Sequence, residues 1–527
     1  MTVVLERSDR ARLGTCDSWC AVAGTAVPGH LPADRQLVGL DWTLEEIFDE
    51  TVEEWWNLGQ ALGQEPSAGW AHAPACVTNA SDLGLMLAWT RLVERWAADE
   101  ARLLVLCDDP WLFRHLASRP GVIAGRPPPL RRREWRLFLR GLLARTKAAF
   151  RLARAARALA HQRKSVAKGS SAILVYGHPA STAAGEDAYF GPLLREVPNL
   201  VRMLHVDAPL ERAQALGKDG RSLSLHAWGS PRFARSLWKL RWRPVFGDWL
   251  VRRAAALEGG TGQAALIAWQ NHCQRAWLAE IRPKVVAWPW ENHAWERDFV
   301  RAARALGVAT LGYQHATVGW REWNYAPHSN PDGAASLPDR ILTVGPADLG
   351  RLSRYGCPRN RLAILGALRY SRPARPPVDP QAPVFVPLTA NPAINGELLD
   401  ALRPLAAAGR RFLVKPHPLA PYPVPSEKGF TLCTKRLGEV EAISAVLYCV
   451  TTVGLEAVLA GLPTLRFRPR GLVAVDILPE GVTIPTAGAD ELGKALATLT
   501  RPPSVPLESV FAPAEIETWR TLLGGGA

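Results

Sequence analysis

The chain has 527 residues, 48% hydrophobic and 21% charged, so disorder is not the default and more than one domain is expected. The formal charge is +14, and eight scattered Cys without a Cys-x-x-Cys pair argue against a disulfide framework or a zinc site. Because the N-terminus also lacks the apolar run of a signal peptide, a cytoplasmic protein is predicted.

The first 130 residues contain one clear buried strand. The apolar run 103–107 ends in Asp108 and Asp109, and a helix pattern follows Pro110. Three consecutive prolines at 127–129 then interrupt the chain, because proline opposes both helix and strand continuation. A break is therefore expected before the segment that follows.

That segment, 131–164, is strongly basic, with ten Arg and two Lys against the single acid Glu134. Aromatic and leucine side chains interleave with the arginines at roughly helical spacing, which predicts a basic helical insertion over 131–168. No nucleic acid partner is expected, since no zinc-finger, helix-turn-helix or RNP-like pattern accompanies the charge. Two interpretations stay open: peripheral contact with an anionic membrane, or a solvated helical hairpin that covers part of the fold.

From residue 172 onward, short apolar runs alternate with helix patterns. This rhythm is typical of parallel sheets covered by helices, so the fold class is predicted as α/β with two Rossmann-like domains. Gly and Pro at 331–338 mark a boundary. The predicted organisation is an N-terminal domain over 1–335, a C-terminal domain over 336–505, and a last helix in 506–527 that could return to the first domain.

Two motifs in the second series follow buried strands. Lys415, His417 and Pro418 follow the run 412–414, where they offer a cation and an imidazole held by flanking prolines. A loop histidine bonded to backbone is the plainer alternative. A second His-Pro at His178 shows that the dipeptide alone is weak evidence.

The partner motif begins where the run 445–450 becomes a helix. Thr451 and Thr452 offer hydroxyls and backbone N–H groups at a helix start, which favours anions, and Gly454 would let a ligand approach the backbone. Glu456 would accept from a ribose or base hydroxyl. Plain helix capping by the threonines is the alternative. Together the two motifs predict a phosphate cradle for a nucleotide at the carboxyl ends of the strands.

The first series carries the candidate catalytic residues. In the stretch 288–297, a strand ends in Trp288-Pro289-Trp290, and Glu291 follows it. A carboxylate between tryptophans would be partly desolvated, which raises its pKa toward the range of a general base. His315, at the end of the next strand, is a second base candidate or a donor to the leaving phosphate. Structural roles are the alternative for both residues.

Several common catalytic signatures are absent from the sequence. It has no Asp-x-Asp, no Gly-x-x-x-x-Gly-Lys-Ser/Thr loop, no His-Glu-x-x-His and no Gly-x-Ser-x-Gly turn. No metal site and no resident cofactor are therefore expected.

Over about residues 280–470 the chain resembles bacterial surface-carbohydrate biosynthesis glycosyltransferases of the GT-B fold. The resemblance lies in the stretch 288–297, in Tyr-Gln-His-Ala-Thr at 313–317 and in Leu-Gly-Ala-Leu-Arg-Tyr at 365–370. The His-Pro motif with a downstream hydroxyl pair is similar to that of sialyltransferases and Kdo transferases, in which both elements contact CMP. The resemblance implies two Rossmann-like domains facing across a cleft, and it gives these CMP-binding roles to His417, Pro418, Thr451 and Thr452.

The pattern departs from those families in two places. Their acidic Asp/Glu-Gly motif is absent, so Glu291 is a base by position only, and the hydroxyl pair is Thr-Thr instead of Ser-Ser or Ser-Thr. The predicted function is transfer of Kdo or a sialic-acid-like sugar from a CMP donor to a surface-glycan acceptor, at the inner face of the cytoplasmic membrane. The alternatives are a polyol-phosphate transferase using a CDP-polyol, and a non-catalytic glycan- or membrane-binding protein on a GT-B frame.

Overall fold

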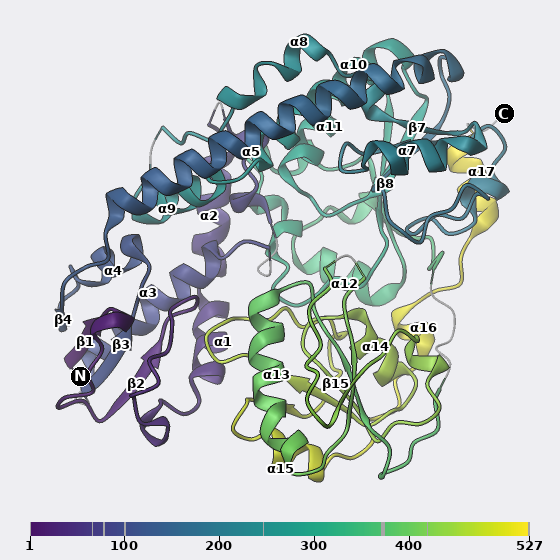
Figure 1. Cartoon of the computed structure of the whole chain (residues 1–527). Coiled ribbons are helices and arrows are strands. Elements are labelled where there is room, and N and C mark those ends of the chain that lie inside the picture. Colours follow the sequence, from purple (N-terminus) through teal and green to yellow (C-terminus); the bar gives the residue numbers. More distant parts are fainter. Residues whose placement is uncertain are drawn as a thin grey trace.

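The computed structural model describes residues 2–65, 67–76, 80–99, 102–245, 247–369, 375–418 and 420–524. Within these ranges the strands form three sheets, of four, seven and six strands, and every strand pair is parallel (Figure 1). The predicted α/β class is confirmed, and each of the two larger sheets belongs to a Rossmann-like half.

The N-terminal sheet has the order β2-β3-β1-β4. Its strands are β1 (Thr2–Glu6), β2 (Ser18–Ala21), β3 (Arg102–Leu106) and β4 (Val122–Ala124). It packs with helices α1 (Leu40–Glu50), α2 (Val52–Gly63), α3 (Leu83–Ala98) and α4 (Pro110–Leu116) around its own apolar core. The sequence predicted one of these strands clearly, but not a separate sheet.

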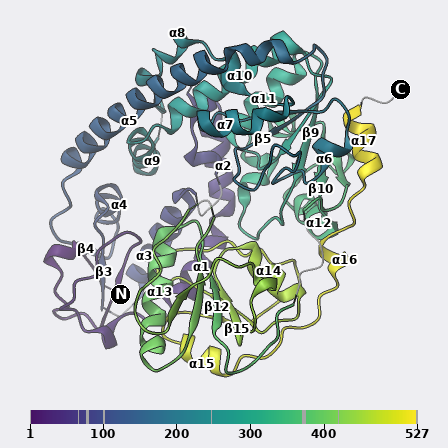
Figure 2. The ribbon, with the colours of Figure 1, turned by 45° about the vertical axis from the view of Figure 1, so that its right-hand side comes forward.

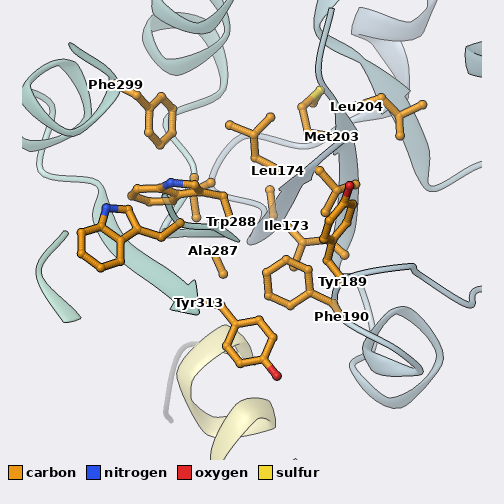
Figure 3. Close-up of a cluster of buried hydrophobic side chains, with 14 of the residues drawn as sticks. Ile173, Leu174, Tyr189, Phe190, Met203, Leu204, Ala287, Trp288, Phe299 and Tyr313 are labelled. Carbon is orange, nitrogen blue, oxygen red and sulfur yellow. The ribbon is translucent and has the colours of Figure 1, made fainter. Parts of the chain in front are cut away.

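The seven-stranded sheet has the order β11-β10-β9-β8-β5-β6-β7. The strands are β5 (Ala172–Val175), β6 (Val201–Leu204), β7 (Ser222–Ser224), β8 (Val285–Pro289), β9 (Ala309–Gln314), β10 (Arg340–Thr343) and β11 (Leu362–Ile364). The central strands are buried along their length, as expected of a parallel sheet with helices on both faces. Ile173, Trp288 and Tyr313 belong to the core that this sheet forms (Figure 3).

Helices from distant parts of the chain cover this sheet. They include α6 (Leu193–Glu196), α7 (Leu210–Leu216), α10 (Gln263–Ile281), α11 (Ala294–Arg304), α12 (Pro346–Arg354) and the C-terminal α17 (Ile516–Gly524). In α17, Trp519 is fully buried and meets Phe190 and Tyr313 edge to face, and Arg520 pairs with Glu196 at 2.6 Å. The last helix is thus part of this body (Figure 2).

The six-stranded sheet has the order β14-β13-β12-β15-β16-β17. Its strands are β12 (Val384–Pro387), β13 (Phe412–Lys415), β14 (Phe430–Leu432), β15 (Ala445–Tyr448), β16 (Thr464–Phe467) and β17 (Thr486–Ala487). Its helices include α13 (Pro392–Ala407), α14 (Thr452–Leu459) and α15 (Leu492–Ala497). The short helix α16 (Leu507–Val510) lies beyond it in the chain and packs on α12.

The boundary between the two larger sheets differs from the expected one near residue 335. Strand β10 pairs with β9, and β11 pairs with β10, so both complete the seven-stranded sheet. The change of sheet therefore lies between Ile364 and Val384. The error arose because the 331–338 loop has the composition of a linker, whereas it is an ordinary connection inside one sheet.

The basic segment forms one helix, α5 (Leu130–Leu159), followed by the 3-10 turn Ala160–Ser165, and not a hairpin. It packs against α8 (Pro231–Ala234), α9 (Trp249–Gly259) and α10, and it runs along the outer edge of the molecule (Figures 1 and 2). Within the described ranges, no helix combines the length and the apolarity needed to cross a bilayer.

Candidate functional site

In both larger sheets the strand order reverses at the first strand of the sheet, because later strands add on both sides of it. In the seven-stranded sheet β5 lies between β6 and β8, and in the six-stranded sheet β12 lies between β13 and β15. Ligands of open parallel sheets bind outside the carboxyl ends of the strands at such a switch point. A ligand site is therefore expected at the turns after β5 and β8, and at those after β12 and β15.

The turn after β8 carries Glu291, and a buried carboxylate fixes its backbone. Glu296, in the first turn of α11, accepts the N–H groups of Glu291, Asn292 and His293 at 3.1–3.2 Å. Asn324 donates to the carbonyl of Glu291 at 2.6 Å. Asn292 has a left-handed backbone, φ 57°, which Asn tolerates better than most residues. The backbone of Glu291 is thus held at both its N–H and its carbonyl group.

The side chain of Glu291 is partly accessible and lies beside His293. Burial raises its pKa to about 7, yet 35% of the side-chain surface stays accessible. Its Oε2 lies 3.5 Å from Nδ1 of His293, whose own pKa burial lowers to about 4. The tryptophans play a different part from the one expected: Trp288 and Trp290 are fully buried, and Trp288 donates to Glu296, not to Glu291.

His315, directly after β9, is a neutral imidazole. Burial and then the positive charge of Arg369 lower its pKa to about 3, and the ring meets Tyr189 edge to face at 4.9 Å. The Nδ1 atom is buried, and no partner for it lies in the described part of the chain. A pKa this low makes His315 a weak base at neutral pH, so the role of a hydrogen-bond donor fits it better.

Lys415 and His417 lie at the carboxyl end of β13. The ammonium group of Lys415 donates to the carbonyls of Thr434 and Lys435 at 3.1 and 2.8 Å, so it is held as a fixed cation. His417 is half-buried, and burial lowers its pKa. Pro418 is exposed.

Thr451 ends up on the same edge as His417, with one strand between them. Strand β12 separates β13 from β15, which corresponds to roughly 10 Å across two strand spacings. Thr451 is the N-cap of α14, and its hydroxyl accepts the N–H of Val453 at 3.1 Å. The capping role is therefore realised, and the half-buried Thr452 follows as the first residue of the helix.

Gly454 has a packing reason that the sequence did not reveal. A Cβ at this position would lie 2.3 Å from Cε2 of Tyr448, so the glycine makes room for the tyrosine ring. This accounts for Gly454 without a ligand. Glu456, one turn into α14, is half-buried; burial raises its pKa, and the positive charges of Arg369, Arg436 and Lys415 act against that rise.

Arg369 connects the two edges. Its guanidinium lies 5.9 Å from the ring centre of Tyr189, and its charge helps to lower the pKa of both His178 and His315. The same charge also acts on Glu456, which lies in α14 on the side of the six-stranded sheet. His417 also acts on His178, so the second His-Pro motif lies within electrostatic reach of the first. The two carboxyl edges therefore face one another. Of the resembling stretch 365–370, Tyr370 lies outside the described residues.

Three acidic residues near this site were missed from the sequence. Asp207 follows β6, and burial raises its pKa to about 6. Glu322 has its pKa raised to about 8, chiefly by burial and in part by the charge of Glu291. Glu258 accepts the N–H groups of His72 and Ala73, and burial raises its pKa to about 7. Only Asp207 had a signal, its place at a strand end.

No group of three or more His, Cys, Asp or Glu side chains in the described ranges has the arrangement of a metal site. All eight cysteines are buried and free. The carboxyl edge of the seven-stranded sheet carries a carboxyl group that titrates near neutral pH. The carboxyl edge of the six-stranded sheet carries a cation, hydroxyl groups and an imidazole. Such a site is suited to bind an anion and to accept a proton beside it.

No family model and no curated protein sequence matches the chain. Solved structures resemble it distantly. UDP-N-acetylglucosamine 2-epimerase from Rickettsia bellii is 12% identical, over 67% of this chain and 94% of its own, with a TM-score of 0.38. The lipopolysaccharide outer core galactosyltransferase WaaB is 10% identical (67% and 93%, TM-score 0.34), and the glycosyltransferase SnogD from Streptomyces nogalater is 12% identical (68% and 96%, TM-score 0.28). Likeness at this level assigns neither an activity nor a substrate.

Proposed function

We propose that the chain is a GT-B glycosyltransferase that moves a sugar from a nucleotide donor to a surface-glycan acceptor. The observation that carries the proposal is the pairing of two facing edges with opposite chemistry, joined by Arg369. The finer part is that the donor is a CMP-sugar, with Kdo or a sialic-acid-like sugar. It rests on the resemblance of His417-Pro418 and Thr451-Thr452 to CMP-binding elements.

In the proposed reaction, Glu291 takes the proton of the acceptor hydroxyl as that oxygen attacks the anomeric carbon. A pKa of about 7 leaves a useful fraction of this carboxyl group ionised at neutral pH. As the bond from the sugar to the phosphate breaks, negative charge grows on the nucleotide. Lys415, His417 and Arg369 are the donors and cations placed to stabilise it, and Thr452 adds a hydroxyl. The donor is a substrate, and no resident metal or cofactor enters the proposal.

The decisive experiment is a calorimetric screen of CMP, CDP, UDP and GDP on the purified chain, followed by turnover assays with the matching sugar donors. Tightest binding of CMP and turnover of a CMP-sugar support the proposal. Preference for CDP with turnover of CDP-glycerol or CDP-ribitol would replace it with polyol-phosphate transfer. Absence of binding to any nucleotide would leave a non-catalytic binding protein.

We further propose that α5 places the chain on the inner face of the cytoplasmic membrane. Four large apolar side chains are exposed on one side of this helix: Trp135 (61%), Leu139 (46%), Leu143 (57%) and Phe150 (76%). Their helical positions fall within about 80° of one another, at 100° per residue. Exposed Arg and Lys flank them, as in helices that lie in a lipid interface.

Vesicle sedimentation tests this placement. Replacing Leu139, Leu143 and Phe150 with Ser should abolish pelleting with phosphatidylglycerol vesicles, because the apolar contacts are lost while every charge remains. The matched control replaces three exposed valines elsewhere, Val27, Val38 and Val245. Equal pelleting of the two triple variants would contradict a membrane role for α5.

A further inference from the structure

A cavity of about 560 Å³ lies away from the site described above. It is formed where the carboxyl edge of the N-terminal sheet meets the first turns of α5, helix α9 and the six-stranded body. Its walls are partly apolar, with Leu85, Trp111, Leu257 and Leu472. A recess of this size at the carboxyl ends of parallel strands accommodates a small organic ligand.

Some of the charged groups that line this cavity are paired with other groups of the fold, and others are not. Arg253 binds Asp82 through both terminal nitrogens at 2.8 and 2.6 Å, and Asp109 at 2.6 Å. Asp108 accepts the backbone N–H of Ser8 at 3.0 Å and also its hydroxyl. The three acids are therefore already paired within the fold.

The arginines contributed by α5 are not paired in this way. Arg132, Arg133 and Arg136 line the cavity and are exposed, and in the described ranges their guanidinium groups form no ion pair or hydrogen bond. Three arginines that line one recess supply guanidinium N–H donors, and such donors bind the oxygens of a phosphate group well. The cavity is thus prepared for an anion with an organic part.

A second cavity adjoins the first. It has a volume of about 450 Å³, and both cavities are lined by Asp82, Leu85, Leu257 and Leu472. Its far wall includes Glu258 and His72. The ring of His72 lies 5.8 Å from that of His293, which in turn contacts Glu291 at 3.5 Å. A series of side-chain contacts, from His72 through His293 to Glu291, therefore leads from the wall of the second cavity to the candidate base.

We infer that Arg132, Arg133 and Arg136 bind a phosphate group carried by the acceptor, whose glycan part then extends through the second cavity toward Glu291. The identity of the ligand as an acceptor rests on the proposed function. The binding of a phosphate ester in this cavity does not.

The test uses inorganic pyrophosphate as the probe, by calorimetry at low salt, on the full chain. A variant with Arg132, Arg133 and Arg136 changed to Gln is compared with one carrying the same change at Arg151, Arg154 and Arg157, exposed arginines farther along the same helix. We expect about a tenfold or larger loss of affinity in the first variant and less than about a twofold change in the second. Equal losses would show diffuse charge attraction, and unchanged binding in the first variant would show that the probe binds elsewhere; either result overturns the inference.

Vesicles distinguish the two sources of such a phosphate group. If the group belongs to a lipid, phosphatidic acid in phosphatidylcholine vesicles should compete with pyrophosphate in the wild-type chain, and the cavity variant should pellet less than the control variant. If it belongs to a soluble glycan phosphate, vesicles should leave pyrophosphate binding unchanged. Because no nucleotide enters these measurements, a negative result here leaves the nucleotide screen intact, and the converse also holds.

Discussion

Glu291 and Glu456 occupy comparable places on the two facing edges, yet their surroundings give them different properties. Both are removed from water, which favours the neutral acid. Around Glu456, the charges of Arg369, Arg436 and Lys415 counteract that effect, whereas burial alone acts on Glu291. The pKa of Glu456 is therefore raised by less than burial alone would raise it, whereas nothing offsets the effect of burial on Glu291. The neighbouring cations, and not depth alone, distinguish the two carboxyl groups.

The largest expected effect comes from removing the titratable group. Glu291→Gln keeps the shape of the side chain but removes its basicity, so turnover should fall by about 10²–10⁴-fold while nucleotide affinity changes little. The exposed Glu134→Gln on α5 is the control. If Glu291→Gln kept its turnover, Glu291 would not be the base, and the proposed difference in role between Glu291 and Glu456 would be wrong.

On the nucleotide side, His417→Ala should weaken CMP binding by about 1–3 kcal/mol, the scale of one lost charge-assisted hydrogen bond. Isothermal titration gives the affinity, and His161→Ala, at an exposed position, should leave it unchanged. An unaltered Kd in His417→Ala would take the imidazole out of the binding site.

The sequence predicted the residues compared here, but not all of their positions and contacts in the fold. His417 and Thr451 each follow a buried strand of one sheet, and carboxyl ends of parallel strands share an edge, so their place on the same edge was accessible from pattern alone. Glu291 follows a buried strand of the other sheet, and the pattern did not relate the two sheets to one another. The pattern did not assign β10 and β11 to their sheet, because an apolar strand reads the same in either half. Glu258 and His72 meet only through tertiary packing between residues 186 positions apart, so no local signal marks them.

The pH dependence of turnover should report Glu291 directly. Its ionised fraction rises from about a tenth at pH 6 to about nine-tenths at pH 8 for a pKa of about 7. Turnover under saturating substrates should therefore rise about tenfold across this interval. A profile that stays flat there would show that the group limiting the rate titrates elsewhere.

The smallest effect concerns Gly454, where two explanations make opposite predictions. Gly454→Ala forces a methyl group against the ring of Tyr448, so the free energy of unfolding should fall by about 1–3 kcal/mol with little change in CMP affinity. Gly350→Ala, in a helix with open space around it, should be neutral or slightly stabilising. Lost CMP affinity at unchanged stability would instead restore the role of Gly454 in ligand approach.

The place of Arg369 between the edges has a thermodynamic consequence. Its charge disfavours the protonated forms of His178 and His315 on one side while it faces the nucleotide edge on the other. A phosphate bound at Arg369 would cancel part of that field, so the pKa of His178 would rise and this imidazole would take up protons in weakly acidic buffer, whereas His315, with a pKa of about 3 caused chiefly by burial, would stay neutral. The heat of nucleotide binding should accordingly vary with the ionisation enthalpy of the buffer, and the slope of that dependence counts the protons absorbed.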